Sequence, residues 1–200
     1  MENYIVLSGE VVSGFRYDHE VFGEEFYTFD LKTKRLSDAY DVITVMVSER
    51  LINVKEDISG KYVKVKGEFR SYNKHIEEHC KLVLFAFAKT ISVVEECDNE
   101  NSAEFDGFIC KQPNFRKTPL GREITDLLLA INRPYGKNDY IPLIVWGRNA
   151  SYVAELPVGT RLNIFGRIQS REYKKVISET ESVTKIAYEV SVNKLNVVKE

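Results

Sequence analysis

The chain has 200 residues, of which 44% are hydrophobic and 12% aromatic. This is enough for a substantial core and about right for two domains of roughly 100 residues each. A net charge of −2 gives no overall indication of a nucleic-acid partner. No apolar run is long enough to cross a membrane, and no signal peptide is visible. The three cysteines, Cys80, Cys97 and Cys110, lack paired spacing, which predicts reduced thiols in a cytoplasmic protein.

The first half of the chain alternates polar and apolar residues in the manner of β-structure. A polar, acidic stretch at 96–103 has no periodicity, and we interpret it as a linker between domains at 1–95 and 104–200. Before the linker we predict one or two helical turns at 49–57 and strands at 4–12, 25–32, 40–48, 61–72 and 80–94.

The second half repeats this plan. Gly9, Gly23 and Arg35 recur 98 residues later, and Gly60, Gly67 and Ser71 recur 99 residues later. Such a near-constant offset indicates an internal duplication. The predicted elements are a basic loop at 113–121, a short helix at 148–155, and strands at 104–111, 123–132, 140–147, 160–171 and 183–198.

Five strands with a short helix between the third and fourth predict an OB-fold in each half, which is a small Greek-key barrel. Glycines inside the strands fit this fold, because a small barrel bends its strands sharply. The predicted class is therefore all-β, with two tandem OB-folds. A single two-sheet sandwich of ten strands is the alternative, and the duplication argues against it.

The strand at 140–147 combines a core stripe with an aromatic face. Successive strand residues point to opposite sides, so Ile141, Leu143 and Val145 share one face. The other face carries an aromatic ring near each end, about 20 Å apart. Separated rings suit single-stranded nucleic acid, because every base has a π-face that can stack. The residues of this second face are Tyr140, Pro142, Ile144 and Trp146.

Basic residues surround this strand in the predicted loops and on the outer stripe of the fourth strand. Of the 28 basic and 30 acidic residues, 15 and 11 lie at 104–200, giving +4 there and −6 at 1–103. This asymmetry suggests different roles for the two halves. Basic side chains can neutralise phosphates while rings stack on bases. The predicted phosphate-binding residues are Arg116, Arg122, Arg133, Lys137, Arg148, Arg167, Arg171, Lys174 and Lys175.

These features resemble the domain of the bacterial single-stranded DNA-binding protein (SSB) family. The resemblance covers 104–198 and is carried by the residues at 126–135, 140–150 and 163–173. In that family four aromatic positions stack bases: one follows the second strand, two bracket the third, and one ends the fourth. Carried over to this sequence, the positions fall on Tyr135, Tyr140, Trp146 and Tyr173, and all four are aromatic.

Two departures qualify what the resemblance implies. The family's acidic C-terminal tail, which recruits replication and repair proteins, is not seen in the sequence ending at 196–200, and an extra domain precedes the resembling part. The doubled domain is similar to SSBs with two OB-folds per chain, which implies a homodimer with four OB-folds. The resemblance also leaves room for a relative of primosomal replication protein N, an OB-fold protein without the tail.

The first half lacks the aromatic set. With an offset of 99, Trp146 corresponds to Val47, Tyr140 to Asp41 and Tyr173 to Lys74, although Tyr40 and Tyr72 lie nearby. The corresponding outer face then consists of Ile43, Val45 and Val47. An aliphatic face on an acidic domain is more typical of a surface that packs against protein than of an exposed DNA-binding surface. We therefore predict that the first domain mainly packs against its sister or a second chain.

The predicted function is non-catalytic binding of single-stranded DNA in replication or recombination. No nucleotide-binding loop or hydrolase motif is present, so no enzyme activity and no cofactor are predicted. His75, His79 and Cys80 lack a second ligand pair, so no metal site is predicted either. The alternative is a primosome-type or phage accessory module whose OB-fold face binds replication proteins. RNA binding also stays open, because stacking does not read the 2′-hydroxyl.

Overall fold

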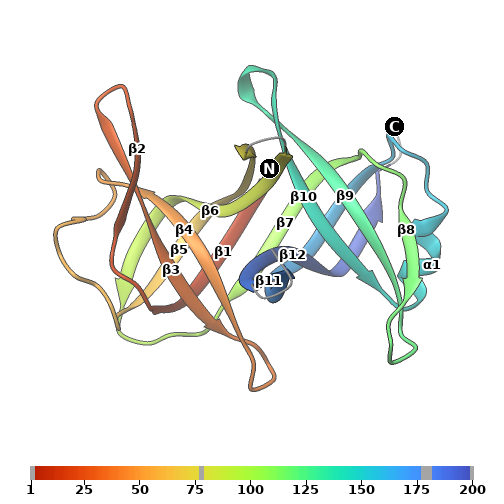
Figure 1. Cartoon of the computed structure of the whole chain (residues 1–200), viewed down its shortest axis with the longest axis horizontal. Coiled ribbons are helices and arrows are strands. Elements are labelled where there is room, and N and C mark those ends of the chain that lie inside the picture. The colour runs from red at the N-terminus through yellow and green to blue at the C-terminus, as the bar shows by residue number, and fades with distance from the viewer. Residues whose placement is uncertain (1–2, 77–78, 177–181, 199–200) are drawn as a thin grey trace.

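A computed structural model describes residues 3–76, 79–176 and 182–198; for 75–76, 79–80, 173–176 and 182–185 it describes the main chain only. The chain forms two barrels that lie side by side (Figure 1). The first barrel is built from β1 (Asn3–Val11), β2 (Arg16–Val21), β3 (Glu24–Lys34), β4 (Tyr40–Ser48), β5 (Tyr62–Ile76) and β6 (His79–Val94).

The second barrel repeats these elements in the same order. Its strands are β7 (Asn101–Ile109), β8 (Asn114–Lys117), β9 (Glu123–Arg133), β10 (Lys137–Trp146), β11 (Arg161–Val176) and β12 (Ser182–Val197). A 3-10 turn, Pro134–Gly136, joins β9 to β10, and helix α1, Arg148–Ala154, follows β10.

Each barrel closes in the strand order of an OB-fold. In the first barrel β1 pairs with both β3 and β5, and β4 pairs in parallel with β6. In the second barrel β7 pairs with both β9 and β11, and β10 pairs in parallel with β12. The predicted tandem OB-folds are therefore confirmed, and so is the duplication in their topology.

The core follows the alternation of the sequence. Ile141, Leu143 and Val145 are buried inside the second barrel as predicted, and so are Leu162 and Ile164 of β11. Burial of aliphatic and aromatic side chains of this kind contributes roughly 1.5–3 kcal/mol per side chain to folding.

One assignment in the first barrel was wrong. Ile43, Val45 and Val47 of β4 are completely buried in the barrel interior rather than on its outer face. The one-residue insertion that changes the offset from 98 to 99 lies after β4 and its counterpart β10, so the offset across β4 is 98. Because side chains alternate along a strand, an error of one residue exchanges the two faces.

Three further predictions are corrected by the structure. Residues 49–57 form turns instead of a helix, because the side chains of Asn53 and Asp57 accept hydrogen bonds from main-chain N–H groups two residues on. The helix between the third and fourth strands is thus present only in the second barrel. Strand β7 begins at Asn101, so the connection between barrels spans 95–100 and not 96–103. The predicted loop at 113–121 contains the short edge strand β8.

The two barrels share a sheet through their first strands. Residues 3–7 of β1 pair antiparallel with residues 101–105 of β7, so the hydrogen-bonded sheet continues from one barrel into the other. Figure 1 shows β1 and β7 between the barrels. Each of these strands starts with an asparagine whose side chain exchanges two hydrogen bonds with a neighbouring strand of its own barrel: Asn3 with Phe69 of β5, and Asn101 with Ile168 of β11.

The glycines inside the long strands β5 and β11 are required by close packing of the main chain. A Cβ at Gly67 would meet the carbonyl oxygen of Phe87, where the β5–β6 pairing shifts register. We expect Gly67→Ala to lower the free energy of unfolding by about 1–3 kcal/mol, because the backbone must move to make room. Urea denaturation measures this change. Gly14→Ala is the control, because its Cβ would meet nothing within 4 Å. Equal unfolding midpoints for the two variants would contradict the packing argument.

Candidate nucleic-acid interface

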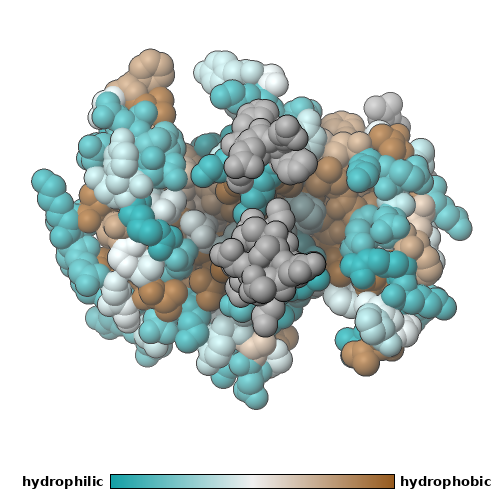
Figure 2. Space-filling model, in the orientation of Figure 1, coloured by the Kyte–Doolittle hydropathy of each residue, from teal (hydrophilic) through white to brown (hydrophobic). Residues whose placement is uncertain are grey.

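The outer surface of the second barrel presents one continuous sheet made of β8, β9, β10 and β12. On this face Tyr140 pairs with Ala130, Pro142 with Leu128, and Trp146 with Ile124. Figure 2 shows a hydrophobic strip over β9 and β10, bordered by hydrophilic side chains. We call this surface the β10 face, and define it by Tyr140, Pro142, Ile144 and Trp146 with their partners on β9.

Trp146 is held at one end of the β10 face. Its indole Nε1 donates a hydrogen bond of 3.1 Å to Ser191 Oγ on β12, and 36% of the side chain stays exposed. The hydrogen bond fixes the ring without covering it. A fixed and partly exposed ring loses little conformational freedom on contact with a flat ligand. Ile144 is also on this face, but it is buried, so it can support the neighbouring side chains and cannot contact a ligand itself.

The tyrosines lie toward the other end of the face. Tyr140 is half-buried near the start of β10, and its main-chain N–H donates to Ser71 Oγ at 2.7 Å. Tyr135 stands on the turn between β9 and β10 with 99% of its side chain exposed and a positive φ of 65°. Tyr173 belongs to β11, but its side chain lies outside the described part of the structure, as do those of Lys174 and Lys175.

The basic residues fall into two groups. Arg122, Lys137, Arg148 and Arg171 have exposed side chains. Three other arginines are next to carboxylates. Arg116 forms a two-pronged pair with Asp126, at 2.6 and 3.1 Å. Arg167 Nη1 lies 3.5 Å from Asp41 Oδ2 of the other barrel, and Arg133 Nε lies 3.3 Å from Asp139 Oδ2.

Asp41 and Asp139 are related by the duplication and clamp the barrels together. Asp41 Oδ1 accepts the Ser170 N–H at 2.7 Å, and Asp139 Oδ1 accepts the Ser71 N–H at 2.7 Å. Both side chains are completely buried. Asp41 lies near the start of β4 and binds β11 of the second barrel, whereas Asp139 lies near the start of β10 and binds β5 of the first. The two contacts therefore cross the junction in opposite directions.

The two clamps differ in strength. Asp41 also accepts bonds of 2.9 and 2.6 Å from Arg35 Nε and Nη2. By contrast, Arg133 Nε and Asp139 Oδ2 form no hydrogen bonds with the part of the chain that the structure describes. Burial raises the pKa of the Asp139 carboxyl above its ordinary value. The negative charge of Asp139 is therefore compensated by fewer hydrogen bonds than that of Asp41.

The first barrel carries aromatic residues on its own outer face that our sequence comparison missed. The phenylalanines Phe26, Phe85 and Phe87 lie there, with Tyr72 of β5 beside them. They occupy positions that differ from those of Trp146 and Tyr140. The alternation of β6 was the available signal, because Phe85 and Phe87 flank the buried Ala86.

None of the described residues forms a cluster suited to holding a metal ion. Among the described helices, none combines the length and apolarity needed to span a bilayer. His75, His79 and Cys80 have side chains outside the description, while Cys97 and Cys110 are free thiols.

Two linked OB barrels, the second of which presents the β10 face, define a tandem OB-fold protein. Residues 100–196 match the single-strand binding protein family model. The Single-stranded DNA-binding protein 3 of Clostridium acetobutylicum is 31% identical over 96 residues, which are 44% of this chain and 67% of that protein. The chain therefore belongs to the single-strand binding protein family.

A second sequence relative agrees with this assignment. The Single-stranded DNA-binding protein of Clostridium tetani is 36% identical over 87 residues, and the match spans 40% of this chain and 60% of that protein. The wild-type single-stranded DNA binding protein of Thermus aquaticus has a solved structure with a TM-score of 0.78, covering 99% of this chain and 93% of that one. At 18% identity this likeness shows the fold alone, and it extends over both barrels.

Proposed function

We propose that this protein binds single-stranded DNA without catalysing a reaction. The observation that carries the proposal is the β10 face. It carries Tyr140 near the start and Trp146 at the end of strand β10, on the barrel that matches the family model. Rings spaced along a sheet can stack on successive bases whatever their sequence. The names of the matched relatives support the same ligand.

Tyr135, Tyr140, Trp146 and Tyr173 are the proposed stacking residues. Phosphate contacts are assigned first to the exposed cations Arg122, Lys137, Arg148 and Arg171, together with Lys174 and Lys175. Arg116, Arg133 and Arg167 also stay in the predicted set, but each is beside a carboxylate, which would have to share its charge with a phosphate.

We further propose that two chains associate into a set of four barrels, as the resemblance to tandem-fold SSBs implies. Light scattering on the purified protein would then give a molar mass twice the 23.1 kDa of one chain. A mass of one chain at micromolar concentration would contradict the dimer without affecting the assignment of the DNA-binding face.

The fluorescence of Trp146 provides the test of DNA binding, because it is the single tryptophan of the chain. We expect thymidine oligonucleotides to quench it, since stacking brings a base onto the ring. The affinity should fall with salt, with the logarithm of the binding constant dropping by about 0.7 per neutralised phosphate for each tenfold increase in salt. If saturating oligonucleotide at low salt leaves the fluorescence unchanged, the stacking assignment is wrong.

A further inference from the structure

The β10 face does not end at the second barrel, because a hollow connects it to the first. This hollow has a volume of about 260 Å³. Tyr140, Lys137 and Arg133 line it from the second barrel, and Tyr72 and Ser71 line it from β5 of the first. A proposed stacking residue of one barrel therefore shares a cavity with an exposed tyrosine of the other.

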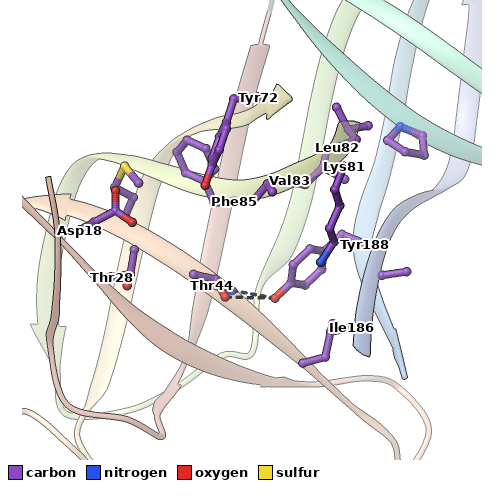
Figure 3. A pocket seen from close by; sticks show the side chains of 14 residues that line it. Asp18, Thr28, Thr44, Tyr72, Lys81, Leu82, Val83, Phe85, Ile186 and Tyr188 are labelled. Atoms are coloured by element: carbon purple, nitrogen blue, oxygen red, sulfur yellow. Dashed lines mark hydrogen bonds between the residues drawn. The ribbon is translucent and has the colours of Figure 1, made fainter. Parts of the chain in front are cut away.

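Two larger hollows continue from Tyr72 over the outer face of the first barrel. One, of about 490 Å³, is lined by Phe26, Phe85, Phe87 and Arg70. The other, of about 650 Å³, reaches Tyr188 of the second barrel, whose hydroxyl contacts Thr44. In Figure 3 the Tyr72 and Phe85 rings stand together, with Tyr188 farther along. We call the three hollows together the junction groove; Tyr72 lines all of them.

The rings of the junction groove form a series along its wall. The Tyr72 and Phe85 ring centroids are 5.9 Å apart, and those of Phe26 and Phe87 are 6.0 Å apart. The Arg70 guanidinium lies over the Phe87 ring at 3.7 Å. Guanidinium and aromatic planes are the two side-chain surfaces on which nucleobases stack.

None of these four rings belongs to the cluster of side chains that fills the barrel interior, although Phe85 is only 9% exposed. Phe69 points inward and is completely buried, whereas its neighbours Glu68 and Arg70 lie on the outer face and pair with each other at 2.7 Å. Phe87 is half-buried between the buried Ala86 and Ala88, so it too points outward. Hollows of a few hundred Å³ with apolar walls and a few polar groups are typical of ligand sites.

We propose that the bases of a bound single strand continue from the β10 face across Tyr72 into the junction groove, so that the first barrel also takes part in binding. This inference rests on the proposed function. It replaces the purely structural role that the sequence suggested for the first barrel. Because the first barrel is the acidic half of the chain, its contribution should come from stacking more than from phosphate contacts.

The variant that tests the groove is Tyr72→Ala, with Tyr62→Ala as its matched control. Both tyrosines lie on β5 with similar exposure, 44% and 41%, but Tyr62 lies outside the three hollows. Binding is followed through Trp146 with a short oligonucleotide of about 8 thymidines and a long one of about 30, since one OB-fold occupies roughly 4–16 nucleotides.

We expect Tyr72→Ala to weaken binding of the long oligonucleotide by roughly 5- to 150-fold, the effect of losing one stacked base, and to leave the short one unchanged. Tyr62→Ala should change neither. If Tyr72→Ala binds the long oligonucleotide as tightly as the unaltered protein, the groove proposal is overturned while the proposed function stands. If the unaltered protein shows no quenching with either length, the proposed function itself fails.

A second variant moves the reporter into the groove. In a protein carrying Tyr72→Trp and Trp146→Phe, the single tryptophan reports on the junction groove. We expect the long oligonucleotide to quench it, because the exposed ring stacks on a base. Absence of quenching, at concentrations where fluorescence anisotropy of a labelled long oligonucleotide shows that the variant is bound, would overturn the proposal.

Discussion

Asp41→Ala should lower the free energy of unfolding by about 3–5 kcal/mol, the usual cost of leaving the partner of a buried ion pair uncompensated. Asp41 is completely buried and accepts hydrogen bonds from the Arg35 side chain and the Ser170 N–H. Removing its carboxylate takes the charged partner from Arg35 and the acceptor from the Ser170 N–H, which weakens one of the two clamps between the barrels. Urea denaturation followed by circular dichroism measures the loss.

Two companions make this result interpretable. Asp38→Ala changes an exposed aspartate in the same β3–β4 hairpin and should alter stability by no more than about 0.5 kcal/mol. Asp41→Asn keeps an acceptor for Ser170 and should lose less than Asp41→Ala. An Asp41→Ala protein as stable as the unaltered one would mean that the clamp contributes nothing to holding the barrels together.

Trp146→Ala should weaken binding of single-stranded DNA by about 1–3 kcal/mol, the typical contribution of one aromatic ring stacked on a base. The fold should survive, because the ring is 36% exposed on an outer face and not in the core. Since the variant has no tryptophan, fluorescence anisotropy of a labelled oligonucleotide replaces intrinsic fluorescence as the measurement.

Tyr152→Ala is the matched control for Trp146→Ala. Tyr152 is an exposed aromatic residue on helix α1 of the same barrel, and it is not one of the residues that define the β10 face. Its loss should leave the affinity unchanged. Equal losses for the two variants would indicate a general effect on the second barrel rather than stacking at Trp146.

The sequence predicted the architecture because strands and duplication leave regular patterns. The two-residue period of Ile141, Leu143 and Val145 predicted their burial, and the repeated glycines predicted two similar barrels. The two-residue period is local, and the repeat of the glycines depends only on spacing along the chain. Both can be recognised without knowing which strands pair.

The contacts of the charged residues were not predictable in this way. Arg116 reaches Asp126 on the neighbouring strand, and Arg167 approaches Asp41, which is 126 residues earlier in the chain and in the other barrel. Nothing in the spacing of these residues indicates such neighbours. The number of basic residues in the sequence is therefore larger than the number of basic side chains that lack a nearby carboxylate in the structure.

The faces of the first barrel were misassigned for a different reason. The position of a single inserted residue decides which side of β4 points inward, and the repeat alone did not locate it. With the corrected offset of 98, Val42 is the equivalent of Tyr140 in the first repeat, and Ser48 is the equivalent of Trp146. The first barrel still lacks that aromatic pair, but its own rings Phe26 and Phe87 lie elsewhere on the outer face.

Binding of single strands against duplex of the same sequence tests the central claim most directly. Equilibrium titration of labelled oligonucleotides at two salt concentrations gives both affinities. We expect tight binding of the single strand, weakening as salt rises, and much weaker binding of the duplex, whose stacked bases cannot reach the rings of the β10 face. Binding to neither form would contradict the account and favour a protein-interaction module, and a preference for duplex would exclude stacking on Trp146 and Tyr140 as the basis of recognition.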